Sequence, residues 1–403
     1  MERHRIAVLG LALALITVSS IASAQAAATP AAPVAAKPAD STAKPADSTA
    51  KAAPAADTVP NFFKDITANA FVSFGYNYNL NQPTNRVNPL RVFDSNANSF
   101  LIDVAELVLQ KPVSKIGDFG FRVDFEAGSA IPVKTQSIGF AIGTGADLQQ
   151  AIVSYIAPVG SGLRLDFGKF ITIHGTEVIE GYDGYNDNYS RSFLFNYAIP
   201  FTHTGVMGTY AFSSQVTASA MVVNGWDNAV DNNNGKTVGL SLVLAPVAPL
   251  SIALHYMGGP EADTSSAMRH LGDVVASYKV NDMLTLGING DYAIDKGSSA
   301  VKPGQDAKWG GVAGYARITT DPRFFIGLRA ETFNDKGGTR LGTGMNTTAS
   351  EFTVTPTFKV SNNFIVRAEG RFDSVDQDGV FADDKGKTKK NQATLGFNAI
   401  FVY

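Results

Sequence analysis

Apolar and polar residues alternate along most of this chain, from about Ile66 to Tyr403. The segment Phe119–Ala127 shows the pattern clearly: its odd-numbered positions are Phe, Phe, Val, Phe and Ala, and its even-numbered positions are Gly, Arg, Asp and Glu. Because successive side chains of a strand point to opposite faces, such a strand has one apolar face and one charged face. Repeated in strand after strand, this arrangement predicts a barrel whose outer surface meets lipid and whose inner surface meets water.

Sixteen segments carry the alternation, and the connections between them are short and long in turn. The strands are expected at residues 66–79, 99–110, 119–127, 148–157, 163–171, 205–212, 216–224, 236–245, 250–257, 270–278, 284–293, 309–318, 324–333, 350–358, 364–372 and 393–403. The eight long connections, among them Gly258–Arg269 and Asp373–Gln392, are rich in Gly, Asp and Asn. Outer-membrane barrels have this rhythm, with both termini in the periplasm. We therefore predict an all-β fold, a transmembrane antiparallel up-and-down β-barrel of about sixteen strands, with fourteen or eighteen as alternatives.

The polar faces of these strands carry acidic and basic residues together. The charged residues expected to line the lumen are Arg122, Asp124, Glu126, Arg164, Asp166, Asp291, Arg317, Arg329, Glu331, Arg367, Glu369 and Arg371. A charge that faces lipid at mid-depth costs about 2–4 kcal/mol, so these side chains are expected to point inward. Two roles are open for them: a transverse field in a water-filled pore, or pairing across neighbouring strands that solvates the wall.

The connection from Thr172 to Thr204 is the longest and carries many charged and aromatic residues. Its candidate constriction residues are Tyr182, Asp183, Tyr185, Asp187, Tyr189 and Arg191. A long connection with so many aromatic residues is expected to be ordered and functional. We expect it to fold into the lumen and set the size limit for solutes; the alternative is that it caps the outer rim.

The N-terminal part differs from the rest in composition. Residues 1–24 combine a basic start, an apolar stretch and an Ala-Ser-Ala end, which is typical of a signal peptide. Residues 25–60 consist mainly of Ala, Pro, Lys, Asp, Ser and Thr, and are expected to form a disordered periplasmic linker. The predicted barrel domain therefore spans residues 61–403.

The sequence offers little chemistry for an enzyme or a cofactor site. It has no cysteine and five histidines, His4, His174, His203, His255 and His270, with no pair at metal-ligand spacing and no Gly-x-Ser-x-Gly motif. The formal net charge is −3, so no basic surplus points to nucleic acid. We expect no catalytic residues, no metal and no cofactor.

The last strand ends on an aromatic residue, Tyr403, with Leu395, Phe397 and Phe401 on the same face. Outer-membrane barrels commonly end in this way, and the resemblance implies recognition by the barrel-assembly machinery. The usual glycine five residues before the last residue is replaced by Asn398.

The segment from Ser73 to about Pro260 resembles the putative β-barrel porin-2 family of Gram-negative outer-membrane proteins. The matching stretches are Ser99–Leu107, Gly120–Asp124, Leu165–Phe170 and Val223–Asp227. The resemblance implies an outer-membrane porin that passes small hydrophilic solutes or ions passively, with lipid and the barrel-assembly machinery as partners and a homotrimer as a further expectation. The alternatives are a surface receptor or adhesin anchored by the barrel, and a facilitator specific for one substrate class such as saccharides.

Overall fold

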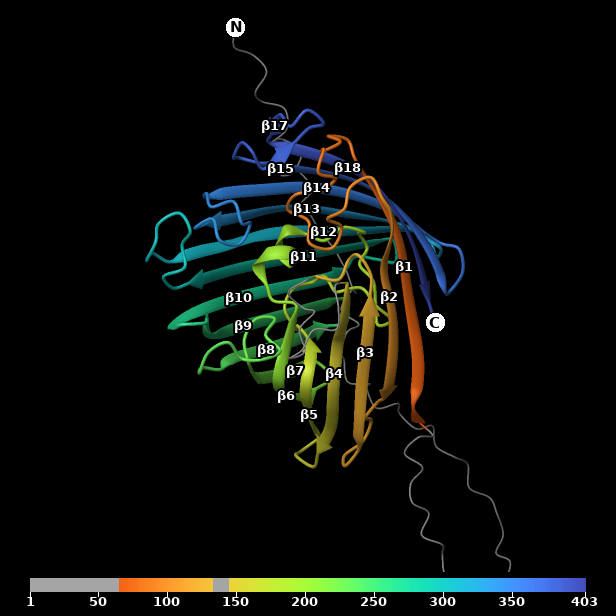
Figure 1. Ribbon diagram of the computed structural model, residues 1–403. Coiled ribbons are helices and arrows are strands. Elements are labelled where there is room, and N and C mark those ends of the chain that lie inside the picture. Colours follow the sequence, from red (N-terminus) through yellow and green to blue (C-terminus); the bar gives the residue numbers. More distant parts are fainter. Residues whose placement is uncertain (1–64, 133–144) are drawn as a thin grey trace, which may run out of the picture.

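The computed structural model describes residues 65–132 and 145–403, and within them sixteen strands form one closed antiparallel barrel (Figure 1). The strands of the wall are β1 (Thr67–Asn79), β2 (Phe100–Lys111), β3 (Phe119–Ala127), β4 (Ala146–Ala157), β5 (Leu163–Ile171), β6 (Thr202–Ser213), β7 (Val216–Val223), β8 (Thr237–Val247), β9 (Leu250–Ala262), β10 (Ser265–Lys279), β11 (Leu284–Asp295), β12 (Ala307–Asp321), β13 (Phe324–Lys336), β14 (Thr347–Lys359), β15 (Phe364–Val375) and β18 (Asn391–Val402). Neighbours in the chain are neighbours in the wall, and β18 closes the barrel between β15 and β1. The predicted fold class and strand number are confirmed.

Two features of the connections differ from the prediction. The prediction of a long connection at Gly258–Arg269 is wrong, because β9 and β10 continue past the expected strand ends and leave a two-residue turn between them. The connection Asp373–Gln392 contains a small hairpin of its own, β16 (Phe381–Ala382) and β17 (Thr388–Lys389). The predicted signal peptide, the predicted linker and part of the connection after β3 lie outside the described residues.

The two faces of the wall have opposite character, as the alternation predicts. Large apolar side chains are exposed on the outer face, such as Phe100, which is 72% exposed, and Phe119 and Leu395. The inner face carries charged side chains that are almost fully buried, such as Arg329, which is 1% exposed. A water-soluble protein would have the reverse distribution. Within the described part of the chain, no helix is long and apolar enough to span a membrane.

The start of the first strand and the end of the chain meet at one edge of the barrel. Ala70 and Tyr403 exchange two backbone hydrogen bonds of 2.8 Å each, which places the end of β18 beside the beginning of β1. The short turns, such as those between β6 and β7 and between β8 and β9, lie at the same edge because an antiparallel wall returns there after every second strand. The longer connections lie at the other edge.

Candidate functional site

Residues 172–201, which join β5 to β6, lie inside the barrel, and we call them the luminal loop. Their polar contacts reach the inner faces of β2, β3, β11, β12, β13 and β15. The loop contains one short π-helix, η3 (Leu194–Ala198), which contacts β11 and β12. A connection that touches so much of the inner wall crosses the lumen rather than covering its rim.

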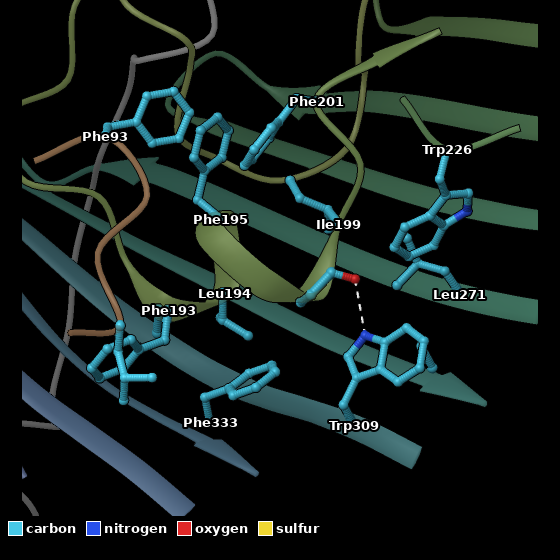
Figure 2. Packing of buried hydrophobic residues seen from close by; sticks show 14 of the residues in the cluster. Phe93, Phe193, Leu194, Phe195, Ile199, Phe201, Trp226, Leu271, Trp309 and Phe333 are labelled. Carbon is cyan, nitrogen blue, oxygen red and sulfur yellow. Dashed lines mark hydrogen bonds between the residues drawn. The ribbon is translucent and has the colours of Figure 1, made fainter. Parts of the chain in front are cut away.

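An apolar cluster holds the η3 end of the luminal loop (Figure 2). Phe193, Leu194, Phe195, Ile199 and Phe201 are all buried and pack against wall residues and against Phe93 of the connection between β1 and β2. The indole Nε1 of Trp309, on β12, donates a 3.1 Å hydrogen bond to the carbonyl oxygen of Ala198. This part of the lumen is therefore packed like a protein core.

The acidic side chains of the luminal loop form ion pairs with arginines of the wall. The pairs are Glu177 with Arg329 (2.6 Å), Glu180 with Arg367 (2.8 Å), Asp187 with Arg317 (2.8 Å) and Asp183 with Arg122. Burial alone favours the neutral acid, but Arg367 and Arg191 outweigh it and hold the pKa of Glu180 below its usual value. Glu180 therefore stays ionised as the pH falls into the range where most carboxylates take up a proton.

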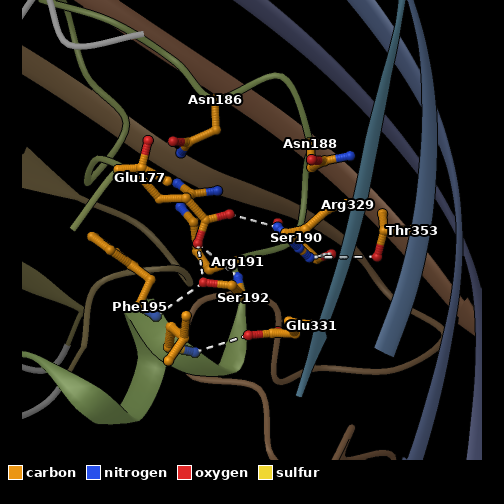
Figure 3. Close-up of polar contacts among 12 residues, drawn as sticks. Glu177, Asn186, Asn188, Ser190, Arg191, Ser192, Phe195, Arg329, Glu331 and Thr353 are labelled. Carbon is orange, nitrogen blue, oxygen red and sulfur yellow. Dashed lines mark hydrogen bonds and ion pairs between the residues drawn. The ribbon is translucent and has the colours of Figure 1, made fainter. Parts of the chain in front are cut away.

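The acidic side chains of the wall accept hydrogen bonds from backbone N–H groups of the luminal loop. Glu106 accepts from Tyr182 (2.6 Å), Glu369 accepts from Tyr189 (2.7 Å) and Ser190, and Glu331 accepts from Phe193 and Leu194. Figure 3 shows Glu331 bound to the start of η3, with Arg329 between the wall and Ser190. Such charge-assisted bonds satisfy backbone groups that would otherwise be buried without partners. The arginines of the wall thus bind the carboxylates of the loop, and the acidic residues of the wall bind its backbone N–H groups.

All twelve charged residues expected to line the lumen are on the inner face. Only the arginines Arg122, Arg164 and Arg317 keep partly exposed side chains. The other nine are buried: Asp124, Glu126, Asp166, Asp291, Arg329, Glu331, Arg367, Glu369 and Arg371. Contact of these residues with a permeating solute stays a prediction, and the structure gives most of them partners within the protein.

The six candidate constriction residues are all part of the luminal loop. Tyr189 and Arg191 are buried: the Tyr189 hydroxyl donates to Asp103 (3.1 Å), and the Arg191 guanidinium lies over the Phe93 ring. Tyr182, Asp183, Tyr185 and Asp187 are partly buried. A limit on solute size set by these residues stays a prediction.

Sequence reasoning missed a cavity of about 190 Å³ between the luminal loop and the wall formed by β4–β9. Its wall side carries a row of polar side chains, because the hydroxyl residues Thr209, Ser219 and Ser241 and the imidazole of His255 are direct partners across β6, β7, β8 and β9. Arg164 and Asp166 also line it, joined by a 2.9 Å ion pair. Small hydroxyl residues give little signal in a sequence, since they are also common in turns and exposed strands.

Comparison with solved structures places the fold among outer-membrane channels. The chain is similar to the outer-membrane channel DcaP of Acinetobacter baumannii (11% identity, TM-score 0.56, 84% of this chain and 97% of that chain). It is also similar to an anion-selective porin from Comamonas acidovorans (12% identity, TM-score 0.56, 84% and 99%) and to the trimer form of OmpT of Vibrio cholerae (10% identity, TM-score 0.52, 84% and 99%). At these identities the likeness shows the fold alone.

The search of curated proteins finds no match. The family model described as "Putative beta-barrel porin-2, OmpL-like" matches residues 65–403, which is the whole barrel. The family suggested by the short strand motifs therefore covers the entire barrel, and the chain belongs to this family.

Proposed function

We propose that the protein is an outer-membrane porin through which small hydrophilic solutes or ions diffuse passively. One observation carries the proposal: the luminal loop fills one side of a closed barrel and leaves on the other side a cavity whose lining combines apolar side chains with a row of hydroxyl groups and an Arg–Asp pair. The family match and the shared fold support a channel rather than an enzyme. The route for solutes runs along the inner wall of β4–β9.

The family places the chain in the outer membrane of a Gram-negative bacterium. We further propose its orientation there, the roles of its N-terminal segments and its assembly. Both termini face the periplasm, which is supported by the shared edge of Ala70, Tyr403 and the short turns. Residues 1–24 serve as the export signal and residues 25–60 as a periplasmic linker. The barrel-assembly machinery inserts the barrel into lipid, and three copies associate as a homotrimer, which is supported by the trimer form of the Vibrio cholerae structure.

Single-channel recording in a planar bilayer tests the proposed function. Purified protein should produce stable, ohmic conductance steps in salt solution, because the proposed route lets hydrated ions cross the barrel. A protein that inserts but remains electrically silent would contradict the porin proposal. That result would favour a surface receptor anchored by a sealed barrel.

A bulky side chain in the cavity tests the route through the barrel. Ser219→Trp should reduce single-channel conductance to about half or less, because the indole narrows the path that the cavity provides. The matched control is Ala220→Trp, one residue along β7, where the side chain is on the exposed outer face. Equal conductance of the two variants would place the route elsewhere in the barrel.

Charge reversal at Arg164 tests whether the cavity governs ion selectivity. Arg164→Glu leaves two carboxylates, with Asp166, facing the path, and should raise the cation-to-anion permeability ratio by a factor of roughly two or more. The control is Arg323→Glu in the exposed turn between β12 and β13. The measurement is the reversal potential across a salt gradient, and equal values for both variants would exclude Arg164 from the path.

A further inference from the structure

Two histidines inside the barrel have no hydrogen-bond partner at any ring nitrogen. His174, in the luminal loop, and His255, on β9, are 2% and 6% exposed, and all four of their ring nitrogens are buried and unpaired. Their rings are 5.4 Å apart and nearly perpendicular. His203 lies beside them and differs, because its two ring nitrogens contact Gly225 and Thr172. Buried polar atoms without partners are rare in folded proteins, because their desolvation is then not compensated by a hydrogen bond.

Two carboxylates extend this pair across the wall. His255, Asp273 and Asp291 are direct neighbours across β9, β10 and β11, all on the inner face. The distance from His255 Nε2 to Asp273 Oδ2 is 3.9 Å, which is too long for a hydrogen bond. Both carboxylate oxygens of Asp291 are buried, and this carboxyl group faces that of Asp273. The cluster therefore combines imidazole nitrogens that have no hydrogen-bond partner with two neighbouring acidic side chains.

The geometry of this cluster is close to that of a metal site. One ligand atom from each of His174, His255 and Asp273 lies within 4.8 Å of the others. Bonds of about 2.0–2.1 Å in a tetrahedral zinc site place ligand atoms about 3.4 Å apart, so modest side-chain rotations would close the difference. Asp273 is already oriented by two donors, the Gly175 N–H and the Asn289 amide, at 2.7 Å each. Hydrogen bonds of this kind typically orient metal ligands.

We propose that His174, His255 and Asp273 bind one divalent transition-metal ion of the Zn²⁺ class. Neutral imidazole and carboxylate are the ligands that such ions prefer. His174 and His255 both line the cavity, so a water molecule from it completes the coordination. The bound ion cross-links the luminal loop to the wall at β9 and β10. No local motif reveals the site, because its ligands are far apart in the sequence and meet only when the loop enters the barrel.

Metal titration of the full barrel protein, prepared without a histidine tag and stripped with a chelator, tests the site. Calorimetry with Zn²⁺ should show one ion per chain. His174→Ala and His255→Ala should each weaken binding by at least about 100-fold, which is the upper end of the loss for residues that merely support a ligand. The control, His270→Ala, removes a histidine whose ring nitrogen contacts the exposed Tyr256 hydroxyl, and should leave affinity unchanged. Equal binding by wild type and the His174/His255 double variant would overturn the proposal, as would an equal loss in the control.

A spectroscopic titration of the unmodified protein keeps the proposal testable even if a variant fails to fold. Co²⁺ in a site with two imidazoles and a carboxylate should give the visible absorption of a four-coordinate ion, and Zn²⁺ should abolish it by displacement. A spectrum that matches Co²⁺ in water alone would count against the site.

Discussion

Replacing residues 182–197 by a short Gly–Ser linker should raise single-channel conductance several-fold. These residues contain most of η3, the part of the apolar cluster around Phe193 and Phe195, and most of the contacts with β13 and β15. Their removal opens the packed side of the lumen to water, and the buried wall charges, such as Arg329 and Glu331, become hydrated. A barrel of sixteen strands is wide enough to hold an aqueous channel when no segment fills it.

The control for this replacement is the same linker in place of residues 300–305, most of which are exposed in the connection between β11 and β12. That variant should keep the conductance of the parent protein. Resistance of the barrel to detergent at room temperature, followed by gel electrophoresis, confirms that both variants are folded. An unchanged conductance after replacement of 182–197 would mean that the luminal loop does not limit flow.

The second large effect is expected at Arg329, which joins the loop to the wall. Its guanidinium contacts Glu177 (2.6 Å), Glu351 (2.8 Å) and the carbonyl oxygen of Ser190 (2.7 Å), and all of these contacts are buried. Arg329→Gln leaves the buried carboxylate of Glu177 without its cation, and leaves Glu351 with Arg371 alone, at 3.7 Å. Removing one partner of a buried ion pair typically costs about 3–5 kcal/mol, so the free energy of unfolding should fall by that amount.

Urea unfolding of protein inserted in phospholipid vesicles measures this loss. Arg323→Gln, at an exposed turn, is the matched control and should leave the free energy of unfolding unchanged. The Arg329→Gln channel should also fluctuate between the normal and a larger conductance, because the loop is released part of the time. A loss in stability below about 1 kcal/mol, the size expected for an exposed pair, would show that the Arg329 contacts do not hold the loop.

The sequence predicts the wall well because lipid imposes one simple rule on every strand. An outward position must be apolar and an inward position may be polar, so alternation marks both the strands and their faces. The rule fails at the hairpin of β9 and β10, where Gly258, Gly259 and Pro260 were expected to end a strand. The extension at Pro260 pairs only with β10, since β8 begins at Thr237 and pairs no further than Gly258. Proline is tolerated there because one edge of the strand is free.

The partners of the inner charges could not be predicted from the sequence. Alternation shows that Arg329 and Arg367 face inward, but their partners Glu177 and Glu180 come from a loop more than a hundred positions away. No spacing rule connects such residues. The many charged residues of the loop indicated that it is functional, whereas the row of hydroxyl groups around Ser219 gave no indication of the cavity. The carboxylates of the loop and the inward arginines of the wall could together have suggested that the loop docks in the lumen, though not which residues pair.

The absence of cysteine allows the most direct test of the claim that the loop divides the lumen into a packed side and an open side. Ser219→Cys places a thiol in the cavity, and Thr357→Cys places one on the inner face of β14, where Thr357 is fully buried and its hydroxyl has no partner. During single-channel recording, a cationic, water-soluble thiol reagent should reduce the current of Ser219→Cys and leave that of Thr357→Cys unchanged. Modification of Thr357→Cys with no effect at Ser219→Cys would contradict the account.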